Sequence, residues 1–134
     1  MASFSILEVA GHALAAQSTR LNTVASNMAN ADAVSGRPED VYQARHPVFR
    51  TLLTESGHAT VQVTEITTDT AEPQLRYMPG HPDADDNGYV YAPNVDVVEA
   101  MADMLSASRA YQSNLELMNT SKDLLMRTLE TGRG

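Results

Sequence analysis

The 134-residue chain contains no cysteine and no tryptophan, and it has only two phenylalanines and five tyrosines. Without cysteine, disulfide bonds and thiolate metal sites are impossible. Few large aromatic side chains are available to anchor a core or an interface, and seven methionines supply flexible apolar filler instead. The length predicts one structural domain.

Basic charge is scarce, with nine Lys and Arg against seventeen Asp and Glu and a net charge of −8. A surface this acidic repels phosphate backbones and anionic lipid, so nucleic acid is excluded as a partner. No apolar run approaches the ~20 residues that a membrane-spanning helix needs, which argues against membrane insertion. No Lys or Arg precedes the small residues 13–15, so a cleaved secretory signal peptide is not expected.

The motifs of catalysis are also missing, because the sequence has no nucleophile elbow, phosphate-binding loop, dinucleotide fingerprint or His-Glu-x-x-His zinc motif. We therefore predict no enzymatic activity, no catalytic or metal-binding residues, and no cofactor. The one metal-like sequence is Asp83-Ala-Asp-Asp-Asn-Gly88, which matches the first six positions of a calcium loop. Its twelfth position is Asn94, where a bidentate Glu is needed, so an acidic turn is favoured over a calcium site.

What the sequence does contain is a helical period at each end. Residues 1–32 predict an N-terminal helix, and Ser5 followed by Glu8 resembles a capping box near its start. Residues 94–134 predict a longer C-terminal helix that begins at an Asn94 N-cap. Apolar residues recur every seven positions in both helices, as in a coiled-coil seam. The predicted subunit-packing residues are Leu7, Leu14, Leu21, Val24, Met28, Met101, Met104, Tyr111, Leu115, Met118, Leu125 and Leu129.

Residues 33–93, between the helices, predict loops and short strands. Alternation of apolar and polar residues indicates strands at 60–64, 74–78 and 88–91, and residues 42–49 are expected to be extended. The predicted fold is therefore mostly α. Two long terminal helices form a coiled-coil-like hairpin, and the central segment is a small insertion that holds a little hairpin sheet at most.

The N-terminal helix is poor in charge, which is typical of a helix packed against protein on several sides. It also carries Asn22, Asn27 and Asn30, although Asn is a mediocre helix former. Two interpretations stay open for these residues. They are solvated polar positions, or their amides form hydrogen bonds between packed helices and fix the register.

Residues 20–32, Arg-Leu-Asn-Thr-Val-Ala-Ser-Asn-Met-Ala-Asn-Ala-Asp, resemble the N-terminal motif of flagellar rod and hook proteins. The sequences at 79–85, 88–90, 93–95, 106–114 and 122–129 resemble the proximal-rod (FlgC) type of the flagellar basal-body rod family. The residues that carry this resemblance are Asn22, Asn27, Asn30, Pro82, Asn94, Ser106, Arg109 and Tyr111.

The resemblance implies a structural subunit that is exported by the flagellar type III apparatus with its N-terminus intact. Such subunits polymerise helically in the periplasm, with themselves and other rod proteins, next to proteins of the basal-body ring and export-gate junction. They transmit torque, and their terminal helices form the inner tube of the rod. The alternative function is a cytosolic coiled-coil adaptor or secretion-associated module, and a calcium-dependent function rests on residues 83–88 alone.

Overall fold

The computed structural model describes residues 2–133, and Met1 and Gly134, at the ends of the two predicted helices, lie outside them. Helix α1 spans Ala2–Ala29 and helix α2 spans Val97–Gly132. The segment between them forms four strands: β1 (Arg45–Leu53), β2 (Ala59–Thr68), β3 (Gln74–Tyr77) and β4 (Tyr89–Ala92). A short 3₁₀ turn, Pro38–Asp40, precedes β1.

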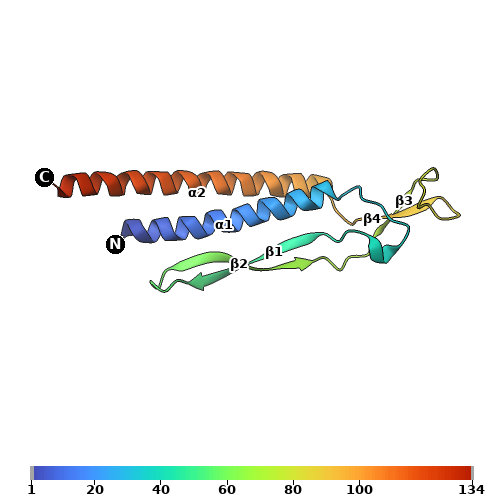
Figure 1. Cartoon of the computed structure of the whole chain (residues 1–134), viewed down its shortest axis with the longest axis horizontal. Coiled ribbons are helices and arrows are strands. Elements are labelled where there is room, and N and C mark those ends of the chain that lie inside the picture. Colours follow the sequence, from blue (N-terminus) through green and yellow to red (C-terminus); the bar gives the residue numbers. More distant parts are fainter. Residues whose placement is uncertain (1, 134) are drawn as a thin grey trace.

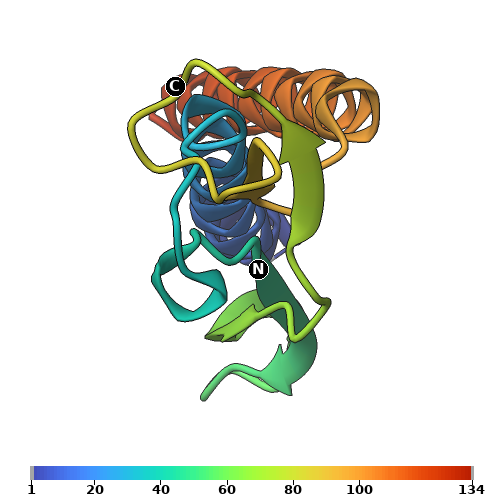
Figure 2. The same cartoon turned by 90° about the vertical axis from the view of Figure 1, so that its right-hand side faces the viewer.

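The two helices lie side by side and antiparallel, with the N-terminal end of α1 and the C-terminal end of α2 at the same end of the molecule (Figure 1). The β1–β2 hairpin packs against the other side of α1, so α1 is the middle of three layers (Figure 2). This position explains the low charge of α1, because side chains on two of its sides meet protein instead of water.

The prediction of a mostly α protein with a small insertion was wrong. β1 and β2 are nine and ten residues long and pair antiparallel along their whole length, with a bulge between Val48 and Phe49. β3 and β4 form a second antiparallel sheet beyond the ends of the helices (Figure 1). The central segment is therefore a β-region comparable in extent to a helix. The predicted strands at 60–64, 74–78 and 88–91 all fall on or next to observed strands.

Both predicted N-caps were wrong. Ser5 lies inside α1, where its hydroxyl donates to the carbonyl oxygen of Ala2, so it is not a cap. The N-cap of α2 is Asp96 instead of Asn94, because the Asp96 carboxylate accepts hydrogen bonds from the backbone N–H groups of Val98 and Glu99, at 2.9 and 3.2 Å. A carboxylate at this position also complements the positive end of the helix dipole.

The buried core is built from small side chains. Among residues 2–133, the buried hydrophobic residues are all Ala or Val, and the largest fully buried side chains are Val90, Thr60 and Pro93. Ala10, Ala16 and Ala107 are buried in the two helices, which pack against each other. Most of the large apolar side chains therefore lie outside the core.

Candidate assembly interface

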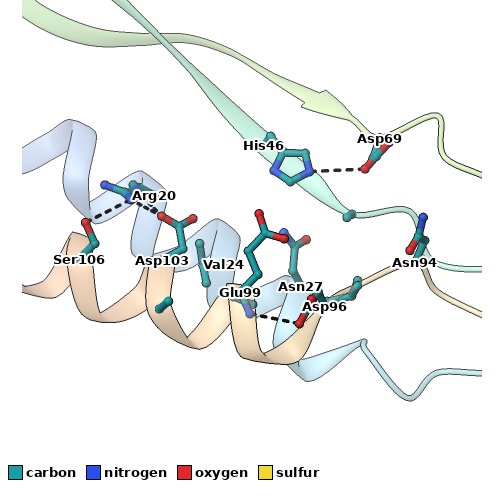
Figure 3. Close-up of a pocket in the computed structure, with 14 residues that line it drawn as sticks. Arg20, Val24, Asn27, His46, Asp69, Asn94, Asp96, Glu99, Asp103 and Ser106 are labelled. Atoms are coloured by element: carbon teal, nitrogen blue, oxygen red, sulfur yellow. Dashed lines mark hydrogen bonds and ion pairs between the residues drawn. The ribbon is translucent and has the colours of Figure 1, made fainter.

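Two side-chain networks hold the three layers together, and the first joins α1 to α2. The Arg20 guanidinium on α1 forms an ion pair with the Asp103 carboxylate on α2, and its Nε lies 2.8 Å from the carboxylate. A second guanidinium nitrogen donates to the Ser106 hydroxyl at 3.4 Å. Figure 3 shows these three side chains facing one another between the helices. The contact fixes which turn of α1 lies beside which turn of α2.

The second network joins α1 to the β1–β2 hairpin through Asn27. The Asn27 amide donates to the carbonyl oxygen of Arg45 at 2.8 Å and accepts from the Arg45 backbone N–H at 2.9 Å. The Tyr42 hydroxyl donates to the same amide oxygen, also at 2.8 Å. The Asn27 side chain is only 6% exposed. Its two hydrogen bonds with the backbone of Arg45 replace those that a neighbouring strand would make. The partner of this amide is a strand and not a second helix.

The other two asparagines of α1 have different roles. Asn30 follows the last helical residue, and both its backbone N–H and its side-chain amide donate to the carbonyl oxygen of Ser26, at 3.1 and 2.8 Å, which closes the helix end. Asn22 is exposed. The three residues therefore do not act as one set.

A groove of about 770 Å³ lies where α1, the start of α2 and the base of the hairpin meet (Figure 3). Its acidic groups mostly have partners within the chain. Asp96 caps α2, Asp103 pairs with Arg20, and Asp69 lies 3.8 Å from His46. Within residues 2–133, no group of three or more His, Cys, Asp or Glu side chains is gathered in a way that could hold a metal ion. The groove is therefore a polar contact region between α1, α2 and the β1–β2 hairpin.

The acidic sequence at 83–88 forms a turn, as predicted. The Asp85 carboxylate accepts hydrogen bonds from the backbone N–H groups of Asn87 and Tyr89, both at 2.9 Å. Gly88 has a φ of +85°, in the left-handed region that favours glycine.

The predicted packing residues divide into two groups. One group is buried or half-buried where α1 and α2 meet: Leu7, Leu14, Leu21, Val24, Met28, Met104, Tyr111, Met118 and Leu125. The other group stays exposed on α2: Met101 (57%), Leu115 (40%) and Leu129 (57%). In place of these three residues, α2 buries the small side chains of Ala107 and Ser121.

The residues of the predicted family motif are scattered over the molecule. Asn94 is exposed and accepts a hydrogen bond from the Gln74 amide at 2.9 Å. Ser106 contacts Arg20, Arg109 is exposed on α2, and Pro82 is exposed in the acidic loop. These residues therefore do not form one site.

Of one exposed apolar surface on α2, sequence reasoning identified only Met101. Val98, Met101 and Leu105 are spaced three and four residues apart, so they share one face of the helix. They are 77%, 57% and 62% exposed. We call these three residues the α2 stripe. Its signal in the sequence is the apolar spacing at 98, 101 and 105, of which only position 101 belongs to the predicted heptad seam. No helix in residues 2–133 has the length and apolar character needed to cross a membrane.

Two family models match this chain at its helical ends. Residues 7–36 match a model described as "Flagella basal body rod protein", and residues 86–131 match one described as "Flagellar basal body rod FlgEFG protein C-terminal". These regions contain most of α1 and most of α2, so the fold and the matches define a class, the rod-type structural proteins of the flagellum.

Curated relatives narrow the class to one family. The chain is 48% identical over 135 residues to the flagellar basal-body rod protein FlgC of Salmonella typhimurium, which covers 99% of this chain and 100% of the relative. It is 47% identical to the protein of the same name from Yersinia enterocolitica and 35% identical to that of Bacillus subtilis, with the same coverage. The chain belongs to the FlgC family of flagellar basal-body rod proteins. It is a structural subunit of the basal-body rod and not an enzyme, which sets the adaptor hypothesis aside.

Proposed function

We propose that this chain is a subunit of the proximal part of the rod. In this proposal it is exported by the flagellar type III apparatus with its N-terminus intact. It then polymerises helically in the periplasm with itself and other rod proteins, next to the ring and export-gate junction. The sequence motifs of the proximal-rod type support this placement, and the family membership supports assembly with other rod components.

One observation supports polymerisation most directly. Small apolar side chains fill the core, whereas larger apolar side chains lie on the surface. The core of residues 2–133 holds Ala and Val, whereas seven larger apolar side chains, all Leu or Met, are exposed on α2 alone. Fully burying one such side chain contributes about 1.5–3 kcal/mol, so covering several of them with neighbouring subunits would stabilise an assembly strongly. Exposed apolar patches mark protein–protein interaction sites, and the α2 stripe is a patch of this kind.

Torque transmission follows from the same packing. An interface made of many apolar contacts repeated along a lattice is stiff, because closely packed side chains resist displacement. The two internal networks, Arg20 with Asp103 and Asn27 with Arg45, keep the three layers of each subunit in register. Force applied to one subunit would then pass to the next without a moving active site.

The test is to place charge on the α2 stripe. Met101→Glu combined with Leu105→Glu changes two exposed positions, so the melting temperature of the purified chain should stay within a few degrees of the parent. The variant chain should be absent from isolated basal bodies, and the cells should not swim. Burying two carboxylates without partners costs several kcal/mol, which is enough to prevent assembly.

The matched control is Ser113→Glu, an exposed position on α2 outside the stripe. It should enter basal bodies as the parent chain does. Normal swimming and normal recovery of the double variant would contradict the proposal that neighbouring subunits cover this stripe.

A further inference from the structure

The turn that leads into β4 contains the pair Asn87-Gly88. The chain has seven asparagines, and Asn87 is the only one that a glycine follows. The side-chain amide of an asparagine is open to attack by the backbone nitrogen of the next residue, and a side chain on that next residue hinders the attack. Gly88 has no side chain, so this hindrance is missing here. Asn87 is also exposed, so water reaches its amide.

The reaction at such a pair is a loss of ammonia followed by the addition of water. The backbone nitrogen of Gly88 gives up its proton to a base in the solvent and forms a bond to Cγ of Asn87. The bond from Cγ to Nδ2 breaks, the nitrogen takes up a proton and leaves as ammonia, and a cyclic succinimide remains. Water then opens the ring. Opening at Cγ yields aspartate, and opening at the backbone carbonyl yields isoaspartate.

In the folded chain, Asp85 engages the backbone N–H groups on both sides of the reactive bond. Its carboxylate accepts hydrogen bonds from the N–H groups of Asn87 and Tyr89, both at 2.9 Å. Its backbone carbonyl accepts from the N–H of Gly88, also at 2.9 Å. Gly88 itself is buried. The nitrogen that must lose its proton is therefore hydrogen-bonded and shielded from the base that would take the proton.

Further hydrogen bonds hold this turn closed. The backbone N–H of Asp85 donates to the carbonyl oxygen of Tyr89 at 2.9 Å. The carbonyl oxygen of Gly88 accepts from the backbone N–H of Met78 at 2.8 Å. Freeing the Gly88 N–H therefore means opening the turn, as it does in amide hydrogen exchange, and the reaction rate falls with the fraction of time that the turn is open.

We propose that Asn87 is a site of spontaneous deamidation and that Asp85 protects it in the folded chain. The inference does not depend on the proposed function. The isoaspartate product inserts an extra backbone carbon into the turn that the hydrogen bond from Gly88 to Asp85 closes. This change should loosen β4, whose Val90 and Ala92 are fully buried. A chain that stays unfolded for long therefore acquires a permanent defect at this turn.

The experiment incubates the purified full chain at mildly alkaline pH, in buffer and in concentrated guanidinium chloride. Trypsin then releases residues 77–109 as one peptide, and mass spectrometry measures how much Asn87 has become aspartate or isoaspartate. The conversion should be about tenfold slower in buffer, because only the unfolded chain leaves the Gly88 N–H free. Asn94 lies in the same peptide and precedes Val95, so it is the internal control and should stay unchanged in both solutions.

Substitutions at the two neighbouring aspartates test the protecting residue. Asp85→Ala should raise the conversion of Asn87 in buffer about fivefold, because it removes the acceptor of two hydrogen bonds that hold the turn. Asp85→Asn keeps a side-chain oxygen and should restore most of the protection. Asp86→Ala, an exposed position in the same turn, is the matched control and should leave the rate in buffer unchanged. Rates in guanidinium chloride correct for any effect of the substitution on the reaction itself.

Equal rates in buffer and in denaturant would overturn the proposal, because the fold would then give no protection. So would an Asn87 that reacts no faster than Asn94 in denaturant. A folded Asp85→Ala chain that reacts no faster than the parent would show that Asp85 is not the protecting residue. If a thermal melt shows that this variant does not fold, hydrogen exchange in the parent decides instead, and rapid exchange of the Gly88 amide would contradict the protection.

Discussion

At the residue scale, Asn27 is the polar side chain of α1 that connects this helix to the start of β1. Its amide has three hydrogen-bond partners, two on Arg45 and one on Tyr42. Asn27 stabilises the fold by pairing with the backbone N–H and carbonyl of Arg45, on the edge of β1 opposite β2. The sequence singled out this residue, but its partner lies 18 positions later in a segment whose pairing no local pattern predicts.

Asn27→Ala should therefore destabilise the chain by about 1–3 kcal/mol, because it leaves the N–H and carbonyl of Arg45 without partners in a partly buried place. Chemical denaturation of the purified protein measures the change in the free energy of unfolding. Asn22→Ala, an exposed position on the same helix, is the control and should change it by less than about 0.5 kcal/mol. Equal effects of the two substitutions would refute the role given to Asn27.

A second residue of this kind is Gly88, where the backbone conformation requires glycine. Gly88→Ala combines a left-handed φ with a Cβ that would lie 2.8 Å from Tyr77 and 3.1 Å from Pro79. We expect a loss of about 1–3 kcal/mol, seen as a lower melting temperature. Gly80→Ala in the same loop meets nothing within 4 Å and should have little effect. A Gly88→Ala chain as stable as the parent would mean that the turn adapts freely.

At the scale of the elements, the presence of both helices and of three strands could be predicted from periodicity, although β2 spans ten residues where five were expected. Two features could not. The strand β1 contains Pro47 and exposes Phe49 and Leu53, so it lacks the alternation that reveals a half-buried strand. On α2, the positions buried against α1 include Ala107 and Ser121, which carry almost no hydropathy signal, whereas Met101 and Leu115 beside them remain exposed. Apolar spacing alone does not distinguish a surface buried within the subunit from one left open.

The Arg20–Asp103 ion pair sets the register of the two helices, and a double-mutant cycle measures its strength. Both side chains are partly exposed, at 23% and 39%, so the coupling energy between Arg20→Ala and Asp103→Ala should be modest, about 0.5–1 kcal/mol.

The comparison pair for this cycle is Arg76 with Asp32, where the Asp side chain is 87% exposed. Water screens that pair, so its coupling should be near zero. A larger coupling for the exposed pair than for the pair between the helices would contradict this account.

At the scale of the whole molecule, stability should be distributed unevenly. Val90 and Ala92 are fully buried, whereas Leu124, Met126 and Leu129 near the C-terminal end of α2 are more than half exposed. In the isolated protein, amide hydrogens of residues 126–132 should exchange much faster than those of residues 89–92. In basal bodies, the same helical end should become protected. Hydrogen exchange with mass spectrometry measures both, and an end already protected in the isolated chain would mean that it needs no neighbour.

The middle position of α1 has a consequence for when the molecule folds. Arg20 and its partner Asp103 are 83 residues apart in sequence, and the hairpin that covers the other side of α1 also follows it. Contacts between such distant segments raise the contact order and slow folding. The first helix therefore gains its two supporting surfaces only when the final third of the chain is present. Until then an emerging chain can cover α1 only with the hairpin, and the side that faces α2 stays open.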